Sequence, residues 1–235
     1  MTTLVTIPGI MSDDRTWAPI AKAVSHRFNA VHVADTTQDN MLTGMASRAL
    51  EATTGGLVIF AHSMGGRVAM EMGRLAPERI IAMVLSSTGH DGPSEDEEPK
   101  RLARIAEGNA GMGAYARNWA PKVLSSGNAQ NPALLQQIVQ MVEECPAEVH
   151  ERQNRALLAR PDASLYLADF DFPVLLMTGS EDHLSTEETH GQIAALLQDA
   201  ESIVIEGAGH LLPFEQPQKV TDAISGWLDR RRLLS

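Results

Sequence analysis

Six short runs of β-branched and other apolar residues recur along the chain, and helical patterns separate most of them. The runs lie at residues 3–7, 29–34, 56–61, 80–86, 173–177 and 202–206. Strands that are apolar throughout are typical of parallel sheets whose two faces are both covered by helices. The sequence therefore predicts an α/β fold with a minimal, mostly parallel six-stranded sheet.

The alternation stops between the fourth and the fifth run. Residues 87–172 carry no strand signal and contain several helical segments, which Gly, Pro and Asn residues separate. An insertion that follows the carboxyl end of a strand can cover a site at that edge of the sheet. We therefore expect a core domain formed by residues 1–86 and 173–235, and a helical cap insertion formed by residues 87–172.

The composition excludes several classes of function. The formal net charge is −11 and no Lys/Arg-rich run is present, which argues against nucleic acid or an anionic membrane as a partner. The first residues, MTTLVTIPGIM, lack the features of a signal peptide, and no segment reaches the roughly 18 apolar residues of a membrane span. We expect a cytoplasmic protein, and the sequence leaves its oligomeric state open.

The segment VIFAHSMGGRVAMEM changes from a strand pattern to a helical pattern at Ser63. Ala61 lies two residues before the serine and Gly65 two residues after it, so that strand and helix can approach closely. This spacing is typical of a nucleophile elbow, a tight turn that exposes a serine above the edge of a sheet. The N–H of Met64 lies at the start of the following helix, where the helix dipole favours negative charge. Ser63 is the candidate nucleophile, and Met64 is a candidate oxyanion donor.

A serine nucleophile requires a general base, and the base requires an orienting carboxylate. The fifth run leads into GSEDHLS and the sixth into GAGHLLPFEQP, so Asp182 and His210 each follow the carboxyl end of a strand. The loop after the first run reads IPGIMSDD, in which Gly9 permits a close turn and the N–H of Ile10 is a second candidate oxyanion donor. The chain order serine, aspartate, histidine is one of those in which catalytic triads occur.

These motifs resemble those of serine hydrolases with the α/β-hydrolase fold, of the small esterase and lactonase type that includes enol-lactonase-like members. The resemblance covers nearly the whole chain, through AHSMGG, GSEDHLS and GAGHLLPFEQP. It implies that Ser63 is the nucleophile, that His210 is the general base and then the acid, and that Asp182 orients the histidine. It also implies an oxyanion hole formed by the N–H groups of Ile10 and Met64.

The sequence departs from the usual family pattern in three places. Ala61 occupies a position that is usually glycine, and Pro8 precedes Gly9 where the family usually has His-Gly. The first run corresponds to the third strand of the family. The expected sheet therefore lacks an antiparallel edge pair.

Large apolar side chains near the expected cap are candidates for substrate binding. They are Trp17, Met112, Trp119 and Met141. An apolar cap suggests a small and mostly hydrophobic substrate. Three arginines in ERQNRALLARPD are interpreted as a solvated helix face, the alternative being contact with a substrate carboxylate; they are Arg152, Arg155 and Arg160.

The activity that we expect is hydrolysis of a small carboxylic ester or lactone through an acyl-enzyme, with no cofactor. The acidic residues of EDHLSTEETH are interpreted as the first turn of a helix and not as a metal site. The single cysteine, Cys145, has no partner for a disulfide and no spaced partners for zinc. Two alternatives remain open, a carbon-carbon bond hydrolase of the same fold and a hydrolase-like ligand receptor with slow turnover.

Overall fold

The computed structural model describes residues 1–233, and its centre is one six-stranded sheet in the order β2-β1-β3-β4-β5-β6. Every neighbouring pair of strands in it is parallel. The strands are β1 (Thr2–Ile7), β2 (Ala30–Val33), β3 (Gly56–His62), β4 (Ile80–Ser86), β5 (Val174–Gly179) and β6 (Ala200–Ile205). The α/β class and the six strands that the sequence predicts are confirmed, with bounds that differ by at most two residues.

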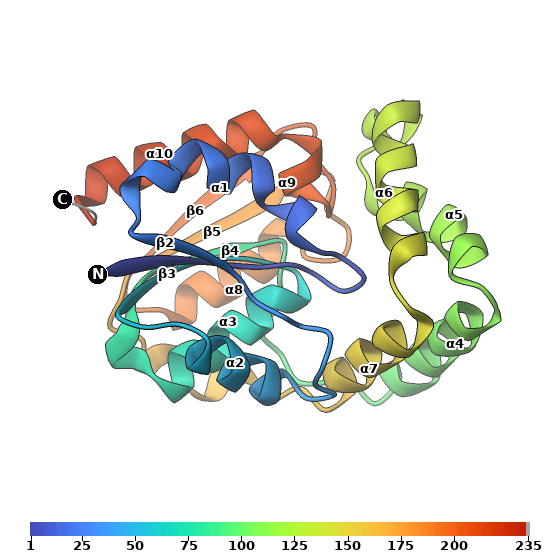
Figure 1. The fold of residues 1–235 in the computed structure, drawn as a ribbon, viewed down its shortest axis with the longest axis horizontal. Coiled ribbons are helices and arrows are strands. Elements are labelled where there is room, and N and C mark those ends of the chain that lie inside the picture. Colours follow the sequence, from blue (N-terminus) through green and yellow to red (C-terminus); the bar gives the residue numbers. More distant parts are fainter. Residues whose placement is uncertain (234–235) are drawn as a thin grey trace.

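Helices cover both faces of the sheet (Figure 1). One face carries α1 (Ala18–Val24), α9 (Leu212–Glu215) and α10 (Pro217–Arg231), and the other carries α2 (Leu42–Glu51), α3 (Met64–Leu75) and α8 (Glu187–Leu196). Each face encloses its own apolar core. Ile20 and Trp227 are buried on the first face, and Met45, Val68 and Ile193 are buried on the second. Burial of apolar surface on both sides explains why the central strands are apolar throughout.

The two edge strands are less buried than the sequence predicts. In β2, Val31 and Val33 are 45% and 43% exposed, and in β6 Val204 is 38% exposed. The interpretation of these two runs as buried strands was therefore wrong. The apolar pattern of a run does not reveal whether a second strand lies on each side of it, because that depends on the order of strands in the sheet.

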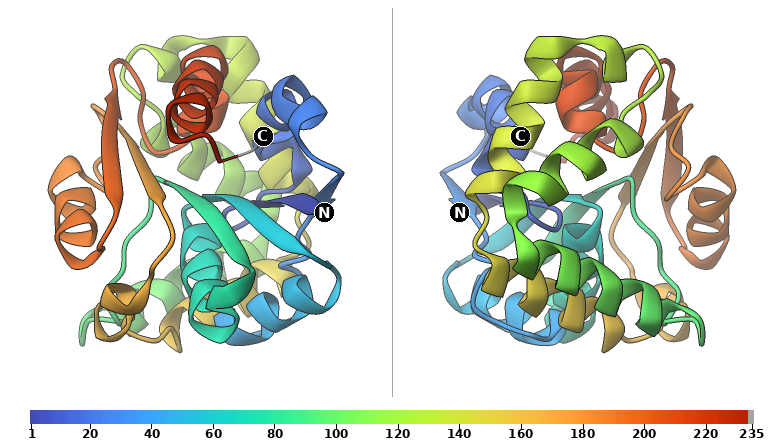
Figure 2. Two further views of the ribbon diagram at one scale, coloured as in Figure 1. Left: turned by 90° about the vertical axis from the view of Figure 1, so that its left-hand side faces the viewer. Right: turned by 90° about the vertical axis from the view of Figure 1, so that its right-hand side faces the viewer.

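Four α-helices lie between β4 and β5 in the chain: α4 (Glu97–Ala110), α5 (Met112–Val123), α6 (Pro132–Glu144) and α7 (Ala147–Leu158). Figure 1 shows them beyond the carboxyl ends of the strands, and the right-hand view of Figure 2 faces them directly. Helix α4 packs against α7, and α5 packs against α6. These helices lie within the segment that the sequence predicts to be a cap. Within residues 1–233, no helix is long and apolar enough to cross a membrane.

Candidate active site

Ser63 occupies the turn between β3 and α3 in a backbone conformation that is rare for a residue with a side chain. Its φ is 53° and its ψ is −116°, and holding such a conformation costs about 1–3 kcal/mol. The turn is fixed on both sides. The N–H of Ser63 donates to the carbonyl of Ser86 (2.9 Å), and its carbonyl accepts from the hydroxyl of Thr88 (2.8 Å) and from the N–H of Gly66 (2.9 Å). The surrounding strands therefore stabilise a strained serine at the carboxyl edge of the sheet.

Glycines allow the loop after β1 to pack closely against this turn. A Cβ atom on Gly65 would lie 2.5 Å from the carbonyl oxygen of Pro8, and a Cβ atom on Gly9 would lie 2.8 Å from Nδ1 of His62. Both distances are shorter than van der Waals contact. The small residue that the elbow pattern requires at position 65 is thus needed for contact with the β1 loop.

The structure brings Ser63, His210 and Asp182 together in a hydrogen-bonded chain. The Oγ atom of Ser63 lies 2.9 Å from Nε2 of His210, and Nδ1 of His210 lies 3.1 Å from both carboxylate oxygens of Asp182. An ionised carboxylate can only accept, so Nδ1 carries the proton and the Nε2 atom of the neutral ring accepts from the serine hydroxyl. This is the tautomer that general-base catalysis requires.

Asp182 is buried and ionised. Burial raises the pKa of its carboxyl group, but the hydrogen bond to His210 and the backbone N–H groups of Ser185 and Leu184 outweigh it and lower the pKa to about 2. Both N–H groups donate to Oδ1 at 2.9 Å. These fixed donors hold the carboxylate in place whether or not the histidine is charged.

The backbone of His210 is held from two sides. Its N–H donates to the carbonyl of Val123 at the end of α5 (2.8 Å), and its carbonyl accepts from Nε2 of His62 (2.8 Å). Burial and the nearby His210 ring lower the pKa of His62 to about 3, so His62 stays neutral at ordinary pH. His62, the residue before Ser63, therefore holds the backbone of His210 through this hydrogen bond.

Ile10 and Met64 line the same cavity as Ser63 and His210, and within residues 1–233 neither backbone N–H donates to another group. The next residue of the β1 loop, Met11, has a φ of 56°, and its N–H donates to Oε1 of Gln153 in α7 (2.9 Å). Gln153 is buried. Gln153, a helix residue far along the chain, therefore fixes the loop in which Pro8 occupies the usual position of a histidine.

The cavity above Ser63 has a volume of about 340 Å³, at the small end of the range for ligand sites. Trp119 of α5 and Leu157 of α7 contribute apolar surface to it. Ionisable side chains contribute more of its lining than apolar ones do: besides His210, they are Arg67, Asp91, Glu97, Arg101, Arg104 and Arg160. This lining does not support the expectation of a mostly hydrophobic substrate.

Residues 4–223 match the model of the alpha/beta hydrolase family. The chain belongs to this family.

Proteins similar to this alpha/beta hydrolase include an esterase and enol-lactonases. It is 24% identical to 3-oxoadipate enol-lactonase 1 of Acinetobacter baylyi over 92% of this chain and 85% of that protein. A thermophilic esterase from Thermogutta terrifontis superposes with a TM-score of 0.89 and 23% identity, covering 100% of this chain and 91% of the other. The enol-lactonase from Burkholderia xenovorans gives a TM-score of 0.83 at 18% identity, covering 97% and 91%. The resemblance to the esterase and lactonase type is confirmed.

Of the four side chains assigned to substrate binding, the structure places Trp119 on the cavity of this alpha/beta hydrolase and the other three elsewhere. Trp17 is buried in the apolar core on the face that carries α1 and α10, and its indole N–H donates to the carbonyl of Ile7 (3.1 Å). Met112 and Met141 pack in the apolar clusters between the insertion helices. Large apolar residues satisfy a helix-helix contact as readily as a ligand pocket, and the sequence pattern is the same for both.

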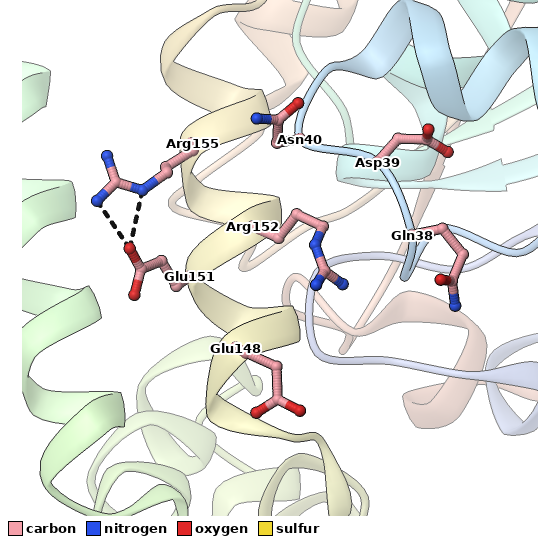
Figure 3. A pocket seen from close by; sticks show the side chains of 7 residues that line it. All are labelled: Gln38, Asp39, Asn40, Glu148, Glu151, Arg152 and Arg155. Atoms are coloured by element: carbon pink, nitrogen blue, oxygen red, sulfur yellow. Dashed lines mark hydrogen bonds and ion pairs between the residues drawn. The ribbon is translucent and has the colours of Figure 1, made fainter.

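The three arginines interpreted as a solvated face have different positions in the hydrolase. Arg160 is buried on the cavity of Ser63. Arg152 and Arg155 instead line a separate hollow of about 440 Å³ between α7 and the loop after β2, which contains no triad residue (Figure 3). In that view Arg155 and Glu151 point toward one another, and their ion pair is exposed.

The side chains that support the turn at Ser63 in this alpha/beta hydrolase were not predicted from the sequence. Thr88, just after β4, binds the carbonyl of Ser63 through its hydroxyl, and its N–H donates to Nε2 of the buried His190 (3.1 Å). Burial lowers the pKa of His190 to about 4, so it remains a neutral acceptor. Thr88 was detectable, because the residues after β4 reach the same sheet edge as Ser63.

Within residues 1–233, no group of three or more His, Cys, Asp and Glu side chains is arranged to hold a metal ion. The thiol of Cys145 is not activated, since burial raises its pKa to about 11. Cys145 is therefore not a candidate nucleophile.

Proposed function

We propose that this protein is a serine hydrolase that cleaves a small carboxylic ester or lactone through an acyl-enzyme. The observation that carries the proposal is the chain of hydrogen bonds from Ser63 through His210 to the ionised Asp182, which opens on a cavity at the sheet edge. Proteins similar to this chain include an esterase and enol-lactonases, which supports the proposal.

In the proposed reaction the hydroxyl of Ser63 attacks the carbonyl carbon while Nε2 of His210 takes its proton. The charge that develops on the carbonyl oxygen is stabilised by the N–H groups of Ile10 and Met64. His210 then protonates the leaving alcohol, and water repeats the sequence on the acyl-enzyme. Asp182 holds the imidazole in the required tautomer and stabilises its cationic form.

Gln153 gives this oxyanion hole a testable support. Replacing Gln153 by leucine removes the acceptor of the Met11 N–H and frees the loop that carries Ile10. Because one oxyanion donor contributes about 10²–10³ in kcat, partial displacement is expected to lower kcat about ten-fold, with a smaller change in KM. Steady-state kinetics measure both constants, and binding of a trifluoromethyl ketone should weaken in parallel with kcat/KM.

The control for this variant is Gln140→Leu, which makes the same change on the exposed side of α6. The variant Gln153→Glu keeps an acceptor for the Met11 N–H and should recover part of kcat. A higher KM with an unchanged kcat in Gln153→Leu would instead assign Gln153 to substrate binding or to the placement of α7.

The proposed function itself is tested with a graded series of 4-nitrophenyl esters and simple lactones, together with labelling by a fluorophosphonate. We expect hydrolysis with a preference for small acyl groups, because the cavity has a volume of about 340 Å³. Labelling is expected on Ser63, located by peptide mass spectrometry. A folded protein that hydrolyses none of the compounds and takes no label would refute the proposal.

Failure of this series would favour one of the two alternatives. Cleavage of a β-diketone would indicate a carbon-carbon bond hydrolase, for which the polar groups of the cavity are a supporting observation. Ligand binding without turnover would indicate a receptor.

A further inference from the structure

The cavity over Ser63 has a surplus of positive charge in a protein whose net charge is −11. Among its ionisable lining residues other than His210, two carboxylates face four arginines. Unbalanced charge next to a reacting serine is costly to desolvate and attracts ligands of the opposite sign. The availability of each arginine depends on its partners.

The hydrogen-bond donors of Arg160 bind groups of the protein itself. Two of its nitrogens bind the two carboxylate oxygens of Glu97 at 2.8 Å, and its remaining hydrogen bonds go to the carbonyls of Asp91, Gly92 and Leu157. Its side chain is 5% exposed. Arg160 therefore joins the end of α7 to the start of α4 and is not free to bind a ligand.

Arg101 and Arg67 use some of their hydrogen-bond donors to bind groups of the protein. Arg101 donates to Glu97 at 2.6 Å and to the amide oxygen of Asn154 at 3.2 Å. Arg67, one turn after the nucleophile on α3, donates to the carbonyl and the carboxylate of Asp91. Burial and the nearby charge of Arg160 lower the pKa of Arg67 to about 10. The lowered pKa is consistent with positive charge that the protein only partly compensates.

Arg104 lines the cavity and, within the described part of the chain, forms no hydrogen bond or ion pair. It lies three residues after Arg101 and seven after Glu97 on α4, which places the three side chains on one face of that helix. Arg104 is an exposed residue, and the donors of its guanidinium are available to a ligand. A free guanidinium beside two partly paired ones matches a planar carboxylate, which accepts two parallel hydrogen bonds.

We propose that the substrate carries a carboxylate in addition to the ester or lactone that is cleaved, and that Arg104 binds it, with Arg101 and Arg67 adding positive charge. This inference rests on the proposed function, since it assigns the substrate class of the same cavity. The carboxylate binds on the α4 side of the cavity while the scissile carbonyl lies at Ser63. The carboxylate contributes to substrate recognition and takes no part in the reaction at Ser63.

The test compares matched substrates that differ in one charge. The mono-4-nitrophenyl ester of hexanedioic acid is paired with its methyl 4-nitrophenyl diester, and 4-acetoxybenzoate is paired with 4-acetoxybenzamide, so that the charge lies on the acyl or on the leaving group. Each kcat/KM is divided by the rate constant for hydrolysis of the same compound by hydroxide. We expect a preference of about ten-fold or more for the anion in at least one pair, declining as salt is added.

The variant Arg104→Gln should reduce this preference by about ten-fold, and Arg104→Lys should retain part of it. Arg117→Gln removes the same charge from an exposed position on α5 that does not line the cavity, and it should leave the preference unchanged. Equal losses in Arg104→Gln and Arg117→Gln, or a wild-type preference for the neutral compounds, would overturn the inference.

Calorimetric binding of hexanedioate tests the carboxylate site without turnover. The Kd is expected to rise about ten-fold in Arg104→Gln and to stay the same in Arg117→Gln. Binding that depends on Arg104 in a protein without esterase activity would refute the proposed function and keep the carboxylate site. Hydrolysis without hexanedioate binding and without a charge preference would refute the carboxylate site and keep the proposed function.

Discussion

Replacing Ser63 by alanine is expected to lower kcat/KM for the best ester by about 10⁴ or more. The variant loses the oxygen that lies 2.9 Å from Nε2 of His210, and no other group within residues 1–233 is hydrogen-bonded to that nitrogen. Binding of the substrate depends on the cavity and should change little. Steady-state kinetics with wild type and variant, together with calorimetric binding of a substrate analogue, separate the two contributions.

A second substitution at the same position controls for the strained backbone conformation of Ser63. Ser63→Gly removes the same hydroxyl but also relieves the positive φ, so it should be as inactive as Ser63→Ala and more stable by about 1 kcal/mol. Urea unfolding measures the difference. Retention of more than about a hundredth of wild-type activity in both variants would show that Ser63 is not the nucleophile.

Replacing Asp182 by asparagine is expected to lower kcat by on the order of 10⁴ at neutral pH. Asparagine still offers an oxygen to the N–H groups of Leu184 and Ser185, so the loop should keep its conformation. It no longer requires a proton on Nδ1 of His210, and the ring can then place its proton on Nε2, where it blocks transfer from Ser63. Kinetics at several pH values check this result, with circular dichroism to confirm folding.

The pH dependence of the wild type follows from the same carboxylate. The pKa of Asp182 is about 2, so the group is charged throughout the neutral and mildly acidic range. Its folded pKa lies below the ordinary value of 3.8, and the unfolded chain therefore takes up the proton first as the pH falls. The stabilising contribution of Asp182 is complete above the ordinary pKa and is lost as the pH falls through the folded value. Asp182→Asn should lack this contribution.

Glu181 provides the matched control for the aspartate. It lies one residue away, and its carboxylate accepts from the N–H of Ser126 at 2.8 Å without contacting the histidine. Glu181→Gln removes the same charge and should change kcat less than about three-fold. If Glu181→Gln lost activity and Asp182→Asn kept it, the orienting carboxylate would have been assigned to the wrong residue.

The sequence determined the strands of the sheet and the positions of Ser63, Asp182 and His210 along the chain. Six apolar runs predicted a mostly parallel sheet of six strands. Burial on both faces accounts for the apolar residues of the central strands, whereas the edge strands β2 and β6 are partly exposed. The positions of Ser63, Asp182 and His210 just after three of those runs placed them at one edge, because the carboxyl ends of parallel strands all lie on the same side. Local pattern and topology agree here, so the hydrogen-bonded chain of three residues was predictable before any distance was known.

Only the tertiary structure decided what surrounds that edge. Trp17 and Met112 have the same pattern as pocket residues but pack in the interior, because amphipathic helices bury apolar side chains wherever two elements meet. The contact of Gln153 with Met11 joins residues that are 142 positions apart. Arg104 and Arg160 differ in role because of the partners available to each guanidinium in space. A sequence pattern records periodicity along one element, whereas burial and charge pairing depend on the elements that pack against it.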